Sequence, residues 1–181
     1  MKPVTNNVAS VLLFFVCLSL VNSTRVKDNN SNDDIIDETC AAVTYKNICL
    51  EGFHQENPTE DLKDGSERVV TAIKIASNNG TDIALHIEQS LDQSKNLKPE
   101  KKKAYEACEA NFDTALKKLE DTLESMENEE YEKMKDDITS AIEDAKDCES
   151  GSHEDPVLSK KTKMFCKQCE NAIDIITKFL H

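Results

Sequence analysis

Apolar residues recur at steps of three and four along most of this chain, and this periodicity restricts its fold more than any other feature. Four stretches carry it, over residues 61–97, 99–126, 129–148 and 155–180. Because an α-helix turns once in about 3.6 residues, positions spaced in this way share one face. Each stretch therefore predicts an amphipathic helix with one apolar stripe on a charged surface. The four stripes consist of the following residues: Val69, Ile73, Ala76, Gly80, Ile83, Ile87 and Leu91; Tyr105, Cys108, Phe112, Ala115, Leu119, Leu123 and Met126; Tyr131, Met134, Ile138, Ala141, Ala145 and Cys148; Phe165, Cys169, Ala172, Ile176 and Leu180.

The residues between these stretches are of the kinds that commonly begin or end helices. Pro99 and Pro156 stand where a first helical turn tolerates a missing N–H, and Gly151 follows the third stretch. Short connections between long helices place neighbours antiparallel. The sequence therefore predicts an all-α fold, an up-down-up-down four-helix bundle. Residues 78–80, Asn-Asn-Gly, predict a break or kink in the first long helix.

The segment before the bundle is shorter and more polar. Residues 24–34 are rich in Asn and Asp and predict a flexible lead-in. A short helical pattern runs from Ile35 to Cys49, and residues 52–59 predict a loop. We therefore expect one helical domain over residues 35–181.

The N-terminus predicts export. Lys2 precedes an apolar run over residues 8–21, which is shorter than the ~20 residues that a membrane-spanning helix needs. Small and polar residues follow the run, as they do at signal-peptidase sites. We interpret residues 1–23 as a cleaved signal peptide, with a retained anchor as the alternative. The expected location is extracellular.

The cysteines and glycosylation motifs fit that compartment. Cys17 leaves with the leader, and six cysteines remain, which allow fifteen pairings. Two pairs stand where a bundle can use them: Cys40 with Cys49 in a short helical hairpin, and Cys108 with Cys148 on consecutive antiparallel helices. Asn29 and Asn79 begin glycosylation sequons that remain after leader removal.

Charge and composition exclude some classes of function. The formal net charge is -13, and no cluster of positive charge suits a nucleic acid. The acidic balance suits a basic partner or simple solubility. No Gly-rich phosphate loop is present, and no membrane association is expected after leader cleavage.

Cys166 and Cys169 are the one motif with possible redox or zinc chemistry. Redox pairs usually stand at a helix N-terminus beside a βαβ unit, whereas these cysteines lie inside a predicted helix. A zinc site would need two further ligands at a matching spacing. We interpret Cys169 as a buried thiol and Cys166 as a free thiol or part of a local bridge. We expect no metal and no cofactor.

The histidines and carboxylates give no catalytic motif. His54, His86, His153 and His181 are scattered, and none stands in a recognisable Ser–His–Asp pattern. Carboxylates are abundant, but on charged helix faces a pair suited to glycoside hydrolysis is a weak proposal. We therefore expect that the protein is not an enzyme.

Several ordered elements resemble plant invertase and pectin methylesterase inhibitors. Residues 36–50, with cysteines nine positions apart, resemble the opening of that family. Tyr105, Cys108, Phe112 and Ala115 resemble its Y-x-x-C-x-x-x-Y-x-x-A signature. Residues 131–148 and 171–176 are similar to its next and closing helices. The resemblance covers roughly residues 34–180.

The resemblance implies a four-helix bundle preceded by a hairpin, with bridges Cys40–Cys49 and Cys108–Cys148. It also implies stoichiometric inhibition of a cell-wall or vacuolar carbohydrate enzyme, with the plant apoplast, or else the vacuole, as the expected location. Pectin methylesterase is the expected partner, blocked by occlusion of its substrate cleft. The first alternative is acid invertase, whose inhibitors often carry Pro-Lys-Phe between the second and third bundle helices, a tripeptide that residues 126–134 lack. Two further alternatives are a bundle without inhibitory activity, for ligand binding or storage, and a thiol-redox enzyme at Cys166 and Cys169. The family usually has one cysteine in its last helix, whereas this chain has two.

Overall fold

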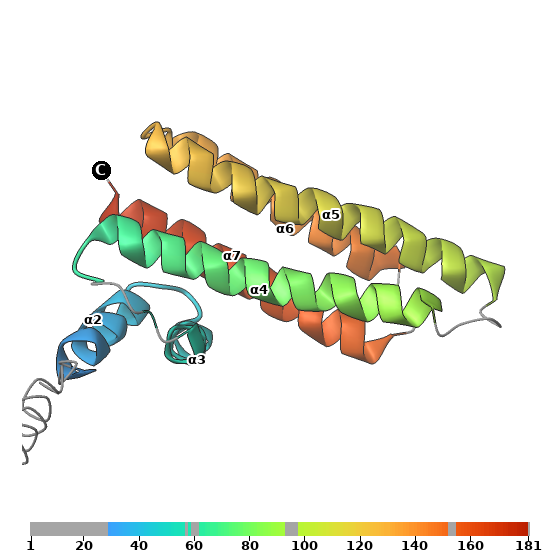
Figure 1. Ribbon diagram of the computed structural model, residues 1–181, viewed down its shortest axis with the longest axis horizontal. Helices are drawn as coiled ribbons and strands as arrows, with labels where there is room; N and C mark the ends of the chain where they lie inside the picture. Colours follow the sequence, from blue (N-terminus) through green and yellow to red (C-terminus); the bar gives the residue numbers. More distant parts are fainter. Residues whose placement is uncertain (1–28, 57, 59–61, 93–97, 152–154, 181) are drawn as a thin grey trace, which may run out of the picture. The chain divides into compact units, whose positions relative to one another are not determined.

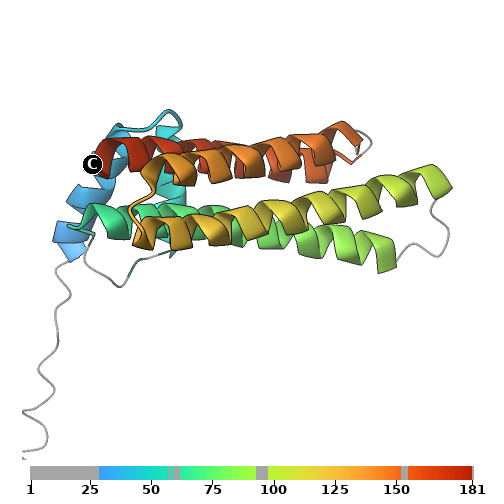
Figure 2. The same ribbon diagram turned by 90° about the horizontal axis from the view of Figure 1, so that it is seen from above.

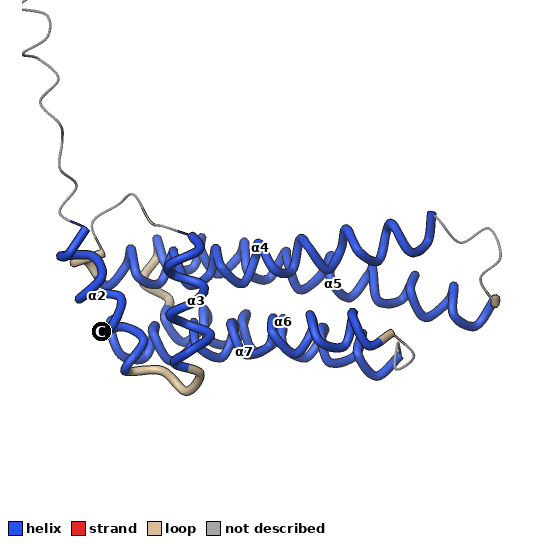
Figure 3. The backbone as a smooth tube through the Cα atoms, turned by 90° about the horizontal axis from the view of Figure 1, so that it is seen from below, coloured by secondary structure: helices blue, strands red, loops and turns tan. Residues whose placement is uncertain are grey.

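The described residues form helices joined by short connections, with no strand among them (Figures 1 and 3). The computed structural model describes residues 29–56, 58, 62–92, 98–151 and 155–180, and side chains from residue 32 onward. Residues 32–181 form one compact unit. The helices are α2 (Asn29–Ala41), α3 (Lys46–Glu56), α4 (Gly65–Asp92), α5 (Pro99–Glu127), α6 (Tyr131–Gly151) and α7 (Pro156–Phe179). The predicted signal peptide lies outside the described residues.

Helices α4 to α7 form the predicted up-down-up-down bundle. Each packs against its two neighbours in chain order, and α7 closes the ring by packing along α4. Figure 2 shows α6 and α7 side by side on one edge and α4 and α5 on the other. None of the described helices is long and apolar enough to cross a membrane.

The apolar stripes meet inside this bundle, as their spacing predicts. Every stripe residue is buried except Leu91, Leu123, Met126, Tyr131 and Leu180, which are partly buried and pack on the core. The rings of Phe112 in α5 and Phe165 in α7 meet edge to face, with centroids 5.4 Å apart. This contact between opposite corners of the ring of helices fixes the centre of the core.

The predicted break at residues 78–80 is wrong, because α4 runs through it without interruption. The reason lies in packing. A Cβ on Gly80 would come within 2.8 Å of Leu116 Cδ2 and 3.0 Å of Phe165 Cε2. Gly80 therefore allows α4 to lie close to α5 and α7, and this contact outweighs the poor helix propensity of glycine, about 1 kcal/mol.

The N-terminal hairpin is more helical than the sequence predicts. Helix α2 begins at Asn29, so residues 29–34 of the expected lead-in are helical, while residues 24–28 lie outside the described part of the chain. Asn and Ser are common at helix starts, and burial of Ile36, Thr39 and Cys40 holds the helix in place. Helix α3 likewise continues to Glu56, through part of the expected loop over residues 52–59.

Both cysteine bridges that the family resemblance implies are present. Cys40–Cys49 joins α2 to α3 with a Cα–Cα distance of 5.5 Å, and Cys108–Cys148 joins α5 to α6 with a Cα–Cα distance of 4.4 Å. In the chain-entropy model, bridges closing loops of these lengths stabilise by roughly 2.5 and 4 kcal/mol. One disulfide therefore cross-links the N-terminal hairpin, and the other cross-links two helices of the bundle.

The buried side chain of Arg68 connects α2 of the N-terminal hairpin with α4 and α7, the first and last helices of the bundle. Arg68, near the start of α4, donates through Nε to the Leu62 carbonyl at 2.8 Å. Its Nη2 pairs with Glu38 of α2 at 3.3 Å, and its Cζ lies 4.4 Å from the centre of the Phe179 ring in α7. Because the Arg68 side chain is only 9% exposed, these contacts hold α2, α4 and α7 together where little water competes.

Candidate inhibitory surface

The end of the bundle where α5 turns into α6 is strongly acidic. Residues 120–137 contain nine carboxylates and two lysines. The carboxylates are Glu120, Asp121, Glu124, Glu127, Glu129, Glu130, Glu132, Asp136 and Asp137. We call residues 120–137 the acidic tip, and it includes the segment in which the Pro-Lys-Phe tripeptide of invertase inhibitors would be expected.

The backbone of the acidic tip is fixed by its own hydrogen bonds. Glu129 N–H donates to the Met126 carbonyl at 3.0 Å, and Glu130 N–H donates to the Ser125 carbonyl at 2.9 Å. This pair of bonds is the Schellman pattern that ends many helices. Glu129 has a φ of 59°, the left-handed conformation that normally favours glycine. The turn therefore carries a charged side chain at a position that is usually occupied by glycine.

Only part of this charge is neutralised within the described structure. Lys117 pairs with Glu120 and Asp121 at 3.0 and 2.8 Å, Lys133 pairs with Asp137, and Lys135 pairs with Glu132. The hydrogen bond from Lys117 lowers the pKa of Asp121. No ion pair to a described residue holds the remaining carboxylates, Glu124, Glu127, Glu129, Glu130 and Asp136. These side chains leave a negative field at one end of the molecule.

A polar cluster ties three helices together beside the start of α7. Asp155 caps α7, with Oδ1 accepting from the N–H groups of Val157 and Leu158 at 2.9 and 3.0 Å. Its Oδ2 lies 3.1 Å from His86 Nε2 in α4 and accepts from Tyr105 Oη in α5 at 2.8 Å. Burial alone raises the pKa of the Asp155 carboxyl, but these hydrogen bonds outweigh it and lower the pKa to about 2. Burial and the bond to Asp155 raise the pKa of Tyr105 to about 12.

This cluster does not have the geometry of a hydrolase triad. A triad needs the imidazole between a serine hydroxyl and a carboxylate. Here Ser90 Oγ donates to the carbonyl of His86 at 2.8 Å, and the His86 ring contacts Asp155. His54 is exposed on α3, while His153 and His181 lie outside the described residues. The histidines therefore form no catalytic constellation in the described part of the chain.

The two remaining cysteines are free, buried thiols in α7. Burial raises the pKa of Cys166 to about 11 and raises that of Cys169 well above its ordinary value. Reactive thiols have lowered pKa values and access to solvent. The described residues also contain no group of three or more His, Cys, Asp or Glu side chains that could hold a metal ion. The two thiols therefore have the environment of structural residues.

The glycosylation sequons remain predictions. The Asn29 side chain lies outside the described residues. Asn79 lies inside α4, partly buried, and its Nδ2 donates to Gln168 Oε1 of α7 at 2.8 Å. A glycan on Asn79 would be attached at the nitrogen that makes this contact.

Comparison with known proteins decides the family. The family model described as plant invertase/pectin methylesterase inhibitor matches residues 34–175. The chain belongs to this family. Its members are inhibitors rather than enzymes, and the disulfide-stapled helical bundle is the fold of this inhibitor family.

Solved structures support the same fold for this inhibitor-family protein. A mutant form of a pectin methylesterase inhibitor from Arabidopsis superposes with a TM-score of 0.65 at 17% identity, covering 77% of this chain and 93% of the other. A second pectin methylesterase inhibitor from Arabidopsis thaliana gives a TM-score of 0.60 at 17% identity, with coverages of 81% and 96%. Comparison with curated protein sequences gives no match.

Two features of the structure were not predicted from the sequence: the side-chain contacts of Asp155 and the left-handed backbone of Glu129. The helix cap at Asp155 could be predicted locally, because Asp before Pro is a favourable helix start. No local pattern in the sequence indicates that Asp155 contacts His86 and Tyr105. The left-handed Glu129 also lacked a signal, since no glycine or asparagine occupies that position.

Proposed function

We propose that this protein is a secreted inhibitor of pectin methylesterase that binds its target one to one and covers the substrate cleft. The observation that carries the proposal is the acidic tip. Pectin is a polyanion, so an enzyme that acts on it benefits from a positively charged cleft. An inhibitor with five carboxylates at one end that form no ion pair with a described residue is attracted to such a cleft, and opposite charges accelerate association.

The rigidity of the tip supports occlusion rather than a flexible contact. The Schellman turn fixes the backbone at residues 125–130, and the Cys108–Cys148 bridge holds α5 and α6 in register. A surface that is ordered before binding loses less conformational entropy when the complex forms. This arrangement suits a stoichiometric inhibitor.

Acid invertase is the alternative target, because the family description includes invertase inhibitors. Residues 126–134 lack the Pro-Lys-Phe tripeptide, and we therefore place pectin methylesterase first. Export through the leader at residues 1–23 would bring the protein to the apoplast, where pectin methylesterase acts on the cell wall.

The experiment compares both targets and tests the role of the tip. Leader-free, oxidised protein is titrated against a plant pectin methylesterase and an acid invertase, and association rates are measured at several salt concentrations. We expect inhibition of pectin methylesterase, with an association rate that falls as salt rises. The triple variant Glu124→Gln/Glu127→Gln/Glu130→Gln should associate several-fold more slowly at low salt.

A matched control separates the tip from total charge. Asp33, Asp34 and Asp37 are exposed on α2, and their conversion to Asn removes the same number of charges. We expect this control to keep most of the association rate. Inhibition of invertase alone, or equal slowing by both triple variants, would contradict the proposal.

A further inference from the structure

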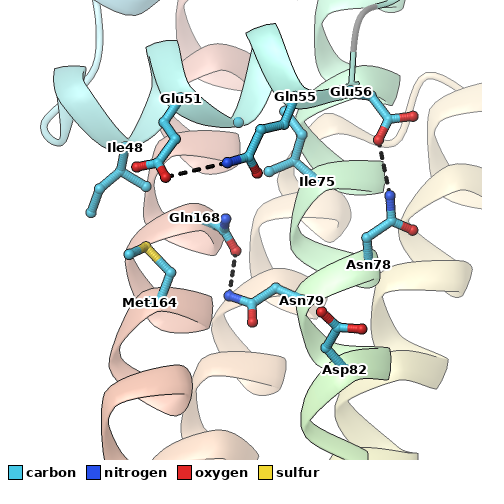
Figure 4. Close-up of a pocket in the computed structure, with 11 residues that line it drawn as sticks. Ile48, Glu51, Gln55, Glu56, Ile75, Asn78, Asn79, Asp82, Met164 and Gln168 are labelled. Atoms are coloured by element: carbon cyan, nitrogen blue, oxygen red, sulfur yellow. Dashed lines mark hydrogen bonds between the residues drawn. The ribbon is translucent and has the colours of Figure 1, made fainter. Parts of the chain in front are cut away.

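A groove lies between α3, α4 and α7, away from the acidic tip and from the Asp155 cluster, and Asn79 of the second sequon is one of the residues that line it (Figure 4). Its volume is about 380 Å³. Its α3 wall runs from Ile48 to Glu56, which spans roughly 12 Å at 1.5 Å per residue. The groove is therefore long enough for an extended small molecule.

Part of the lining is apolar. Ile48 of α3, Ile75 of α4 and Met164 of α7 are partly buried side chains that line the groove. Gly52 also lines it, and a Cβ there would come within 2.8 Å of Ile75 Cγ2. The glycine thus allows α3 to pack closely on Ile75, and the methionine supplies an adaptable apolar contact for a hydrocarbon chain.

The polar part of the lining consists of four amide side chains and three carboxylates, and three of the amides donate to neighbouring oxygens. Gln55 Nε2 donates to Glu51 Oε1 at 3.2 Å, and Asn78 Nδ2 donates to Glu56 Oε2 at 2.9 Å. Asn79 Nδ2 donates to Gln168 Oε1 across the groove, as Figure 4 shows. Each of these three amides keeps its carbonyl oxygen as an acceptor and a second N–H as a donor, so the acceptors of the groove are these carbonyls together with the carboxylates.

The groove is also negatively charged. Three carboxylates line it, on Glu51, Glu56 and Asp82, and none of the lining residues is Lys, Arg or His. Lys74 of α4 pairs with Glu56. Lys167, on α7, lies over the ring of Tyr45 with its Nζ 5.4 Å from the centroid. Two carboxylates, on Glu51 and Asp82, therefore remain without a cation among the described ion pairs.

These properties select the class of ligand. An anion would be repelled, and a bare metal ion would find no group of three converging ligands among the described residues. A cation that donates hydrogen bonds and carries a hydrocarbon chain matches both the acceptors and the apolar wall. We propose that the groove binds an aliphatic polyamine, with its methylene groups on Ile48, Ile75 and Met164 and its ammonium groups toward Glu51 and Asp82.

Spermidine is the probe that tests this proposal. Isothermal titration of the leader-free, oxidised protein at low salt should show one spermidine bound per chain. The groove variant Glu51→Gln/Asp82→Asn should weaken this binding at least tenfold. The control variant Glu124→Gln/Glu127→Gln removes the same charge from the acidic tip, and it should change the affinity less than twofold. Equal weakening by both variants would show that spermidine acts only as a counter-ion, and it would overturn the proposal.

A second measurement locates the ligand without relying on variants. In a methyl-labelled sample, spermidine should shift the NMR signals of Ile48, Ile75 and Met164 at the same concentration that saturates the heat signal. Shifts confined to Met126 and Met134 of the acidic tip, or no shift at saturation, would contradict a site in the groove.

Discussion

The side-chain amide of Asn171 exchanges two hydrogen bonds with the backbone of Tyr45. Its Oδ1 accepts from the Tyr45 N–H at 2.9 Å, and its Nδ2 donates to the Tyr45 carbonyl at 3.1 Å. Next to it, Asp174 Oδ2 accepts from the Thr44 N–H at 2.8 Å. Tyr45 is in the turn between α2 and α3, whereas Asn171 is buried in α7. This pair therefore docks the hairpin turn on the bundle.

Replacement of Asn171 should loosen that docking. Asn171→Ala removes both bonds, at a cost of about 2 kcal/mol. The Tyr45 N–H then loses its acceptor, whereas the Tyr45 carbonyl still accepts from the Cys49 N–H at 3.0 Å. Urea denaturation should show this loss, and hydrogen exchange should become faster over residues 42–56. The control Thr177→Ala, at an exposed site on the same helix, should cost less than about 0.5 kcal/mol. Equal stability of Asn171→Ala and wild type would mean that the hairpin is held by its apolar contacts alone.

Glycine at position 129 should stabilise the fold. The left-handed φ of 59° is unfavourable for glutamate and allowed for glycine. We expect Glu129→Gly to raise the free energy of unfolding by about 0.5–1 kcal/mol, after the added freedom of the unfolded chain is included. The matched change Glu120→Gly, at an exposed position inside α5, should lower it by about 1 kcal/mol. A loss of stability in both variants would argue against the left-handed turn.

The lowered pKa of Asp155 predicts a specific acid sensitivity. Its folded pKa of about 2 lies below the ordinary value of 3.8, so its ionised form contributes stability above about pH 4. This contribution is lost as the pH falls toward 2. Asp155→Asn keeps a capping residue but removes the charge, and it should cost about 1–2 kcal/mol at pH 7 and much less at pH 2.5.

Urea denaturation at both pH values measures this difference. Asp113→Asn, at an exposed site on α5, is the control and should cost less than about 0.5 kcal/mol at either pH. A cost for Asp155→Asn that is the same at pH 7 and pH 2.5 would show that the charge of Asp155 contributes nothing.

The thiols of Cys166 and Cys169 should be inert in the native state. Both are buried, and burial raises both pKa values. An alkylating reagent at pH 8 should label neither thiol until denaturant is added, and mass spectrometry after digestion can assign each site. Rapid labelling of Cys166 in the native protein would instead favour the thiol-redox alternative.

The bundle was predictable because its signal is local and repeated. Helices α4 to α7 are predicted within a few residues of their observed ends from the four apolar stripes, the two prolines at helix starts and the short connections. Gly52 and Gly80 misled the prediction because a glycine suggests a helix end, whereas both lie in helices at close contacts. That role depends on Ile75, Leu116 and Phe165, which come from other parts of the sequence.

The polar contacts between helices were not predictable for a related reason. His86 and Tyr105 are 69 and 50 positions from Asp155, and Asn171 is 126 positions from Tyr45. No spacing rule links residues so far apart in one sequence. The acidic tip was visible as charge, but its unpaired carboxylates could be distinguished from paired ones only after α5 and α6 were placed.

An end-point titration of a plant pectin methylesterase with the leader-free, oxidised protein tests the proposed one-to-one inhibition most directly. The enzyme is held well above the dissociation constant, and the residual demethylation of pectin is followed. We expect the activity to fall linearly and to reach its minimum at one equivalent, and we expect excess pectin to slow the onset because both compete for one cleft. Full activity at a several-fold excess of the protein, over a range of pH and salt, would contradict the proposed inhibition of pectin methylesterase.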